Sequence, residues 1–331
     1  MNATSVSKRG DKGRVPWVSL SAFVLRFPWV WVFIAVVAIW AAIVVISGRG
    51  FLGTMTAVVA LAPFLVMVGI GQLFVITLGN GNIDLSVEYS MPLAGFVGIS
   101  VMNGGGARIG LGILAAVGVG LVVAAANLFC ILVLSIPPIV ATLAVGLVTY
   151  SASSIQAQNF SALPNQELHS FTTSSVGGVA WLAIICVCLA VAAAGLLHRT
   201  SYGRALEAVG QSLRAARLAG VPVTRVTIMS YFICGVLAAL SGLLLSTYIS
   251  PSVVIGQPYL LNSIAVVVLG GSLITGGRSN IVGVWGGALF LLLLTTLLNV
   301  LHIATATQDI VKGGLIILVL ALVQTDRIEG S

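Results

Sequence analysis

The chain has 331 residues, of which 59% are hydrophobic and only 7% are charged, and its net charge is +7. About a quarter of the residues of a soluble globular protein are charged, so these proportions exclude a soluble domain, a coiled coil, a disordered chain and a nucleic-acid-binding protein. They predict an all-α integral membrane protein that crosses the bilayer several times.

Residues 1–27 form a basic segment ahead of the first apolar run. That run, 28–47, is longer than the apolar core of a cleavable signal peptide and lacks a small-residue cleavage site. We therefore expect residues 1–27 to be a cytoplasmic tail. Residues 28–325 are expected to form the transmembrane domain, and residues 326–331 a cytoplasmic C-terminal tail.

Ten apolar segments follow one another along the chain, and one crossing needs about 20 apolar residues. We therefore expect about ten transmembrane helices. The third and eighth segments are short and are interrupted by Gly or polar residues. The segments lie near 28–47, 55–78, 85–104, 109–134, 138–157, 177–197, 226–248, 259–274, 281–300 and 307–324.

Charge placement predicts the orientation of these segments. With a cytoplasmic N-terminus and ten crossings, the outer side receives only Arg49 and Arg108, and Lys312 falls inside the last segment. The other twelve of the 15 Lys and Arg residues are then cytoplasmic. Since Lys and Arg are concentrated in cytoplasmic loops, we expect both termini to be cytoplasmic. A long outer loop is expected at about 158–176, and a long cytoplasmic loop at 198–225.

Residues 205–219 of the cytoplasmic loop have the composition of an amphipathic helix, and Gly220 and Pro222 are typical of its end. A short helix of this kind either lies on the membrane surface or docks into a groove of a partner protein. From the residues alone both interpretations stay open.

Four stretches in order resemble the permease subunits of sugar-type ABC importers, the ribose, xylose, arabinose and galactose group. They are LGNGNIDLSVEYSMPLAG (78–95), IPPIVATLAVG (136–146), GRALEAVGQSLRAARLAGVPV (203–223) and the Gly-rich region 266–289 with 308–322. The chain departs from that group at Asn82 and Glu88, where Gly is usual, and at 260–262, where acidic residues are frequent.

The resemblance implies a transport subunit of a bacterial inner membrane. Two such permeases, either two copies or a copy with a paralogue, would form the path within the membrane lipid. ATPase subunits would bind ATP beneath them, and a binding protein would deliver solute outside. The sequence contains no G-x-x-x-x-G-K-[ST] motif, so we expect no ATPase site, no enzyme activity and no cofactor in this chain.

The resemblance also assigns the cytoplasmic loop as the coupling loop, with its helix seated in a groove of the ATPase. Small residues there would permit close contact, and arginines could pair with acidic groove residues. The predicted coupling residues are Gly203, Arg204, Glu207, Gly210, Ala215, Ala216, Arg217 and Gly220.

Polar residues within the apolar segments are candidates for the translocation path, because such groups are costly in lipid. Asp84 could instead cap the next helix, and Glu88 would share its helix face. Lys312 could simply pair with Asp309, and the amides could join helices. The candidates are Asp84, Glu88, Asn127, Asn262, Gln308 and Lys312.

Other functions stay open at this point. The same architecture could carry nucleosides, a furanone-type signal, a polyol or branched-chain amino acids, and an ion-coupled secondary transporter would also keep membrane carboxylates. No Cys and His cluster has zinc spacing, so we expect no metal site. The four cysteines lie in apolar runs and are expected to be small core residues. They are Cys130, Cys186, Cys188 and Cys234.

Overall fold

The computed structural model describes residues 28–48 and 51–328, and this part of the chain is helical almost throughout. The predicted tail 1–27 lies outside the described residues. The predicted C-terminal tail does so only from residue 329, because the last helix runs on to Ile328. The helices are α2 (Pro28–Ser47), α3 (Phe51–Thr77), α4 (Val87–Met102), α5 (Ile109–Leu128), α6 (Pro138–Gln158), α7 (Gln166–Thr173), α8 (Trp181–Arg199), α9 (Ser201–Gln211), α10 (Leu213–Leu218), α11 (Val223–Ile249), α12 (Gln257–Leu269), α13 (Ile281–Val300) and α14 (Thr305–Ile328).

Each of the ten predicted apolar segments coincides with one of these helices. Within the described residues, seven helices are long and apolar enough to cross a membrane, namely α2, α3, α5, α6, α8, α11 and α13. A one-turn 3-10 helix, Gly106–Arg108, precedes α5, and a π-helical turn, Phe129–Val133, follows it. The all-α membrane architecture is therefore confirmed.

The helices α4 and α12 are shorter than a full crossing. With 16 and 13 residues they are about 24 and 20 Å long, whereas the hydrocarbon core is about 30 Å thick. Each follows a stretch without helix, residues 78–86 before α4 and residues 250–256 before α12. We call each of these short helices, together with the non-helical stretch before it, a broken helix, and Gly and polar residues lie in both stretches.

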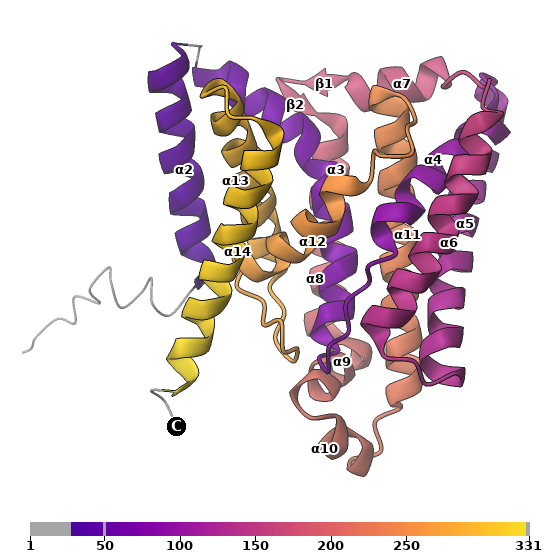
Figure 1. The fold of residues 1–331 in the computed structure, drawn as a ribbon, viewed down its shortest axis with the longest axis vertical. Helices are drawn as coiled ribbons and strands as arrows, with labels where there is room; N and C mark the ends of the chain where they lie inside the picture. The colour runs from indigo at the N-terminus through magenta and orange to yellow at the C-terminus, as the bar shows by residue number, and fades with distance from the viewer. Residues whose placement is uncertain (1–27, 49–50, 329–331) are drawn as a thin grey trace, which may run out of the picture.

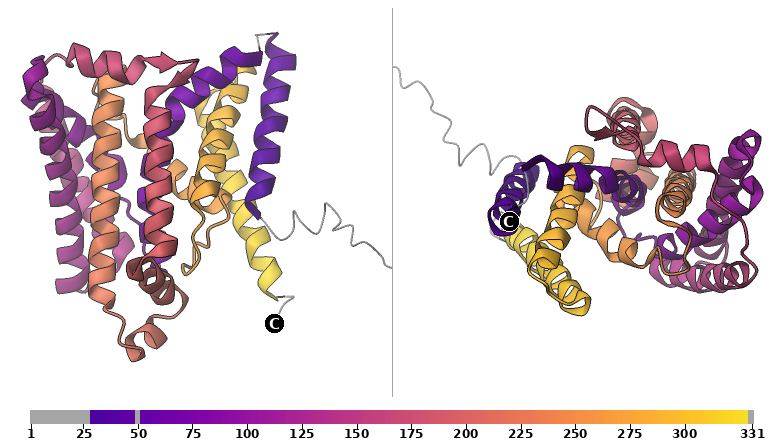
Figure 2. Two further views of the ribbon diagram at one scale, coloured as in Figure 1. Left: turned by 180° about the vertical axis from the view of Figure 1, so that it is seen from behind. Right: turned by 90° about the horizontal axis from the view of Figure 1, so that it is seen from above.

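The helices stand side by side in one elongated bundle (Figure 1 and Figure 2). The long helix α11 packs against α3, α4 and α5, while α13 packs against α2, α3 and α12. The first helix of this core, α3, contains Pro63 and bends within the bundle. In the opposite view α8 and α11 face the reader, so α8 and α12 lie on opposite sides of the bundle (Figure 2).

One end of the bundle carries α9, α10 and the loops 78–82 and 270–280, and we call it the basic end. The helix α2 begins at this end and α14 finishes there (Figure 1). The opposite end carries α7 and a two-stranded hairpin, β1 (Ser175–Val176) and β2 (Val179–Ala180). The prediction of a plain loop at 158–176 is therefore incomplete. A hydrogen bond of 2.8 Å between His169 Nδ1 and the Thr247 carbonyl ties α7 to the end of α11.

Small residues allow the central helices to touch through their backbones. A side chain at Gly120 or Gly235 would collide with the facing backbone where α5 crosses α11, and one at Gly242 would collide with Met91 of α4. Close approach of this kind is typical of helices that pack in lipid. All four cysteines are free, but only Cys186 and Cys234 are buried, so the core assignment fails for Cys188, which is exposed on α8.

Candidate functional site

The predicted coupling loop forms two short helices, so the prediction of one helix over 205–219 is wrong. Ser212 ends α9 and starts α10, because its extended backbone (φ −160°) breaks the helix and its hydroxyl accepts from the Ala215 N–H. The α9 helix itself is capped by Thr200, whose hydroxyl accepts from the Gly203 N–H. The loop is therefore a folded structure with its own caps and not a flexible linker.

One face of α9 is buried against the bundle, as its apolar periodicity requires. Leu206 and Val209 are buried, and the ring of Tyr202 stacks on Phe74 of α3. The Tyr202 hydroxyl shares a 2.8 Å hydrogen bond with Ser230 Oγ of α11. Burial raises the pKa of Tyr202 to about 12, so the phenol stays neutral at physiological pH. These contacts hold α9 rigidly to α3 and α11.

Of the eight predicted coupling residues, four are exposed, two are buried, and Glu207 and Gly210 are half-buried. Arg204, Ala215, Arg217 and Gly220 are exposed at the basic end, where a partner can reach them. Ala216 and Gly203 are buried, and Gly203 lies against the end of α8. The small size of these two residues therefore serves packing within the chain.

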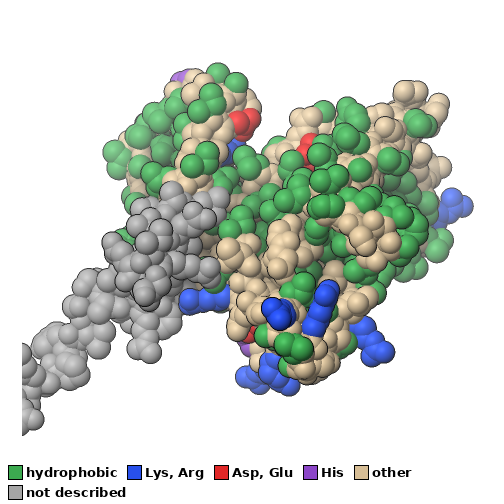
Figure 3. Space-filling model, turned by 60° about the horizontal axis from the view of Figure 1, so that its bottom comes forward, with side chains coloured by type: hydrophobic (Ala, Val, Ile, Leu, Met, Phe, Trp, Pro, Cys, Tyr) green, Lys and Arg blue, Asp and Glu red, His purple; other side chains and the backbone are tan. Residues whose placement is uncertain are grey.

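The basic end is hollowed and positively charged. One hollow of about 520 Å³ lies between α9 and the 270–280 loop and is lined by Glu207, Gln211 and Arg278, among others. A second, of about 580 Å³, opens beside Arg214 and Arg217. Figure 3 shows Lys and Arg side chains gathered around this end of the molecule. Such a surface favours an acidic partner.

The end of α9 and two glycine-containing loops meet at the basic end without a side chain between them. A side chain at Gly210 would collide with the Thr77 carbonyl and the Gly277 N–H, and one at Gly276 would collide with Gly79. The Gly277 N–H donates to the Thr77 carbonyl at 3.0 Å. We call this contact the glycine junction. It joins the end of α9 to both non-helical loops, the one that leads to α4 and the one that follows α12.

Glu207 belongs to the same region, since Ser279 Oγ donates to its carboxylate at 3.3 Å. This predicted coupling residue is therefore turned toward the 270–280 loop.

Asp84 lies at the centre of a buried polar network in the stretch before α4. Its Oδ1 accepts from the Ser86 N–H at 2.9 Å and from Ser86 Oγ at 2.6 Å. Asn127 of α5 donates to Ser86 Oγ at 2.8 Å, and to Asp84 Oδ1 at 3.4 Å. The N-cap of α4 is Ser86 and not Asp84, so the carboxylate fixes the turn before the helix instead of capping the helix directly.

Further polar contacts secure this stretch. Thr142 of α6 accepts from the Leu85 N–H and donates to the Ile83 carbonyl. The Tyr231 hydroxyl of α11 donates to Asn82 Oδ1 at 3.1 Å. Sequence reasoning missed these partners, because they come from three helices far apart in the chain.

Glu88 does not share a helix face with Asp84, because Asp84 precedes the helix. Asp84 is fully buried, whereas Glu88 is partly exposed in the first turn of α4. The Glu88 carbonyl lies directly against Gly256, the residue before α12. The two broken helices therefore begin at the same place.

The other predicted path residues lie elsewhere. Asn262 is partly exposed on α12, while Gln308 on α14 donates to Asn299 Oδ1 at 2.7 Å and to the Ile303 carbonyl. Lys312 is buried and pairs with Asp309 at 3.6 Å, as the sequence spacing suggests. Only Asp84 and Asn127 among the six path candidates bond to one another. No group of three His, Cys, Asp or Glu residues suited to a metal occurs in the described part of the chain.

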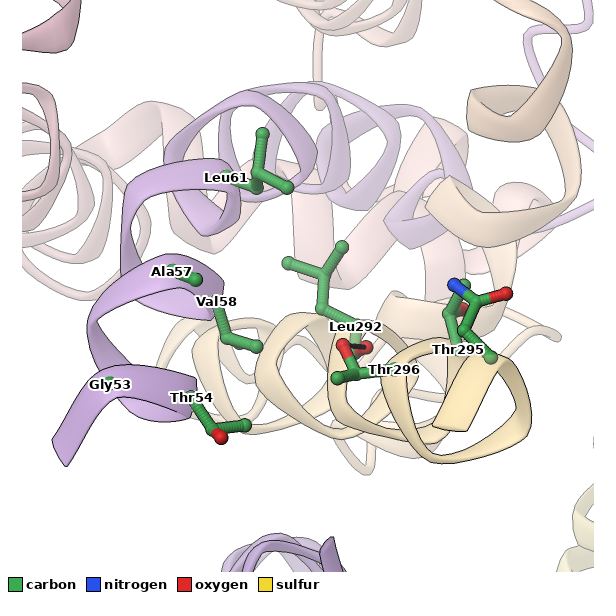
Figure 4. Close-up of a pocket in the computed structure, with 9 residues that line it drawn as sticks. Gly53, Thr54, Ala57, Val58, Leu61, Leu292, Thr295 and Thr296 are labelled. Atoms are coloured by element: carbon green, nitrogen blue, oxygen red, sulfur yellow. Dashed lines mark hydrogen bonds between the residues drawn. The ribbon is translucent and has the colours of Figure 1, made fainter. Parts of the chain in front are cut away.

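A separate pocket of about 470 Å³ lies between the start of α3 and the end of α13 (Figure 4). Its lining is mostly apolar, and the hydroxyls of Thr295 and Thr296 donate back into their own helix. The pocket therefore offers few free polar groups to a polar solute.

Comparison with known proteins decides the family. Residues 54–320 match the family described as branched-chain amino acid transport system / permease component. The chain belongs to this permease family. The match includes the glycine junction, the Asp84 network and both broken helices, so all of these are parts of a permease.

Individual relatives agree with this assignment. The permease is 34% identical over 278 residues to the probable ABC transporter permease protein y4mJ of Sinorhizobium fredii, a match that covers 82% of this chain and 80% of the relative. It is 31% identical to the fructose import permease FrcC of Rhizobium meliloti, and this match covers 86% of this chain and 81% of the relative. It is 41% identical to the ribose import permease RbsC of Bacillus subtilis, but this match covers only 38% of this chain and 40% of the relative. No solved structure matches.

Proposed function

We propose that this permease forms the translocation path of an ATP-driven importer for a sugar or a related small polar solute. Relatives whose names state a solute support this assignment, since they carry ribose, xylose, fructose or autoinducer 2. The chain itself supplies no P-loop, so a separate ATPase subunit binds and hydrolyses ATP. A binding protein delivers the solute on the other side.

The charge distribution supports an orientation with the basic end in the cytoplasm of a bacterial cell and α7 outside. Five of the exposed arginines, Arg204, Arg214, Arg217, Arg225 and Arg278, lie at the basic end, and Arg108 lies at the opposite end. With this orientation α2 starts and α14 finishes on the cytoplasmic side, and both termini are cytoplasmic.

The glycine junction is the main support for the proposed mechanism, in which motion of the ATPase is transmitted to the broken helices. The exposed arginines of α9 and α10 engage acidic groups of the ATPase, whose closure displaces the loop. Because the backbone at Gly210 touches those at Thr77 and Gly277, the displacement passes directly to both non-helical loops. One of these loops leads into the start of α4, and the other follows the end of α12, so the displacement reaches both broken helices.

The broken helices support the location of the path. Non-helical backbone cannot face hydrocarbon, because its N–H and C=O groups would lack partners. In the stretches 78–86 and 250–256, Asn80, Ser252 and Val254 are exposed, and Asn80 lies beside α10 at the basic end. The water-filled path therefore runs along these two stretches, and a second copy of the permease or a paralogue closes it.

The deciding experiment measures ATP hydrolysis by the permease reconstituted with the ATPase and binding protein of its own organism. Ribose, xylose and fructose are tested separately. We expect one sugar to stimulate hydrolysis, and Arg217→Glu to abolish the stimulation while the protein still inserts in the membrane. Uptake that continues without ATP and without a bound ATPase would instead identify an ion-coupled transporter.

A further inference from the structure

The meeting point of α4 and α12 lies deep within the bundle. The helix α4 runs about 24 Å from the outer end to Val87, and α12 runs about 20 Å from the basic end to Gln257. Because the Glu88 carbonyl touches Gly256, the two helix starts lie at one depth near the middle of a hydrocarbon core about 30 Å thick.

Glu88 brings a carboxylate to this depth. Its side chain is partly exposed and has no hydrogen-bond or ion-pair partner among residues 28–48 and 51–328. A charged group at the centre of a bilayer is costly and normally faces a bundle interior or a water-filled cavity. The other carboxylate nearby, Asp84, is fully buried and already accepts three hydrogen bonds. Glu88 is thus the carboxylate that remains free at this depth.

The tyrosine after Glu88 turns toward α6. The rings of Tyr89 and Tyr150 meet edge to face with centroids 5.9 Å apart, and Gly146 leaves room for the Tyr89 ring against α6. Gln257, which follows Gly256, is exposed at the start of α12. A free carboxylate and an exposed amide where α4 meets α12 suit a solute with hydroxyl groups.

We propose that Glu88 places a fixed negative charge in the translocation path and makes the path select uncharged polyhydroxylated solutes against anionic ones. This inference rests on the proposed function, because it needs an aqueous path at this side of the bundle. It assigns the selectivity to one residue, at the position where α4 meets α12. An anionic solute passing that position meets a like charge in a confined space.

The test uses a cysteine as a local probe of charge, in membrane vesicles that hold the complete complex. Cys130 and Cys188 are replaced by Ser, the buried Cys186 and Cys234 are kept, and Gln257→Cys is introduced beside Glu88. Rates of modification are measured with the neutral hydroxyethyl and the anionic sulfonatoethyl methanethiosulfonate. Each rate is divided by the rate for a free thiol in solution. The matched control keeps Cys188, exposed on the opposite side of the bundle, in place of the new cysteine.

We expect Q257C to react with both reagents and to prefer the neutral one. Glu88→Gln should lower that preference about fivefold, the size expected for one unit charge a few ångströms away in a partly aqueous site. Cys188 should be unreactive toward the anionic reagent with or without E88Q. The proposal is overturned if Q257C is as unreactive as Cys188, or if E88Q leaves the preference unchanged.

These outcomes are separable from the proposed function. The labelling rates do not depend on ATP hydrolysis. If the permease couples to its ATPase but E88Q has no effect on labelling, the proposed function stands and the selectivity proposal is overturned. If E88Q has the expected effect but no sugar stimulates ATP hydrolysis, the charged aqueous path is supported. In that case the proposed ATP-driven import is not.

Discussion

Gly210 of α9 and Gly277 of the loop after α12 touch through their backbones, with no space for a side chain between them. The contact is strengthened by Gln211, whose Nε2 donates to the Gly277 carbonyl at 3.4 Å. A motion of α9 therefore reaches the loop directly instead of being absorbed by side-chain rearrangement.

Gly210→Leu should uncouple the permease. The added side chain has to displace the Thr77 and Gly277 backbones, so α9 moves away from the junction. We expect solute-stimulated ATP hydrolysis and uptake to fall at least tenfold. The control is Gly195→Leu on α8, where nothing lies within 4 Å of the added Cβ. Wild-type coupling in G210L would contradict transmission through this contact.

Tyr202→Phe should loosen the anchoring of α9. The variant loses the hydrogen bond to Ser230 and leaves that hydroxyl with only its bond to the Val226 carbonyl. We expect a loss of about 1 kcal/mol in the free energy of unfolding, measured by thermal denaturation in detergent. Tyr248→Phe serves as the matched control, because no hydrogen bond of its hydroxyl occurs among the described residues.

The same tyrosine gives a pH prediction. Because burial raises the pKa of Tyr202 to about 12, the folded state releases its proton later than the unfolded state does. Its contribution to stability is complete below the unfolded-state pKa of about 10 and is lost as the pH rises toward 12. Stability of the wild type should therefore fall more steeply than that of Y202F between pH 10 and 12. Parallel curves for the two proteins would contradict a buried phenol.

Asn127→Leu should destabilise the start of α4. The amide is fully buried and supplies donors to Ser86 and Asp84. Its removal leaves a buried carboxylate with fewer donors, which we expect to cost about 2–3 kcal/mol in unfolding free energy. The exposed Gln158→Leu, on α6, is the control. Unchanged thermal stability in N127L would mean that Asp84 does not need this donor.

Lys312 and Asp309 should respond unequally to substitution. The Lys312 side chain is 9% exposed, whereas that of Asp309 is 66% exposed. Replacing a buried charge by an apolar residue of similar volume is often neutral or stabilising, so Lys312→Met should keep or raise the melting temperature. Asp309→Asn removes the partner and leaves the buried ammonium, so it should lower the melting temperature. The opposite order in a thermal denaturation series would refute this interpretation.

The helices were predictable and their meeting points were not. Ten apolar runs indicate ten helices, because a chain in lipid must satisfy its backbone internally. Glycine and polar residues mark the breaks before α4 and before α12, but nothing local shows that Glu88 touches Gly256. The break at Ser212 is also hidden, since residues on both sides of it favour helix and the serine hydroxyl decides the outcome as a cap.

The candidate site shows the same division. Lys312 and Asp309 pair because they are three residues apart on one helix, and this spacing is visible in the sequence. The partners of Asp84 and Asn82 are not visible, because Asn127, Thr142 and Tyr231 come from other helices. Gly210, a predicted coupling residue, packs closely against Thr77 and Gly277 of the chain itself, and no local pattern shows this contact.

The broken helix at α4 constrains the order in which the protein can be assembled during synthesis. Residues 78–86 leave the ribosome long before Tyr231 and Gly256, yet Asn82 bonds to the former and Glu88 rests on the latter. Until α11 and α12 have been made, this non-helical stretch has no complete set of partners and cannot settle in lipid. The contacts of this stretch are therefore completed only after the second half of the protein has been made.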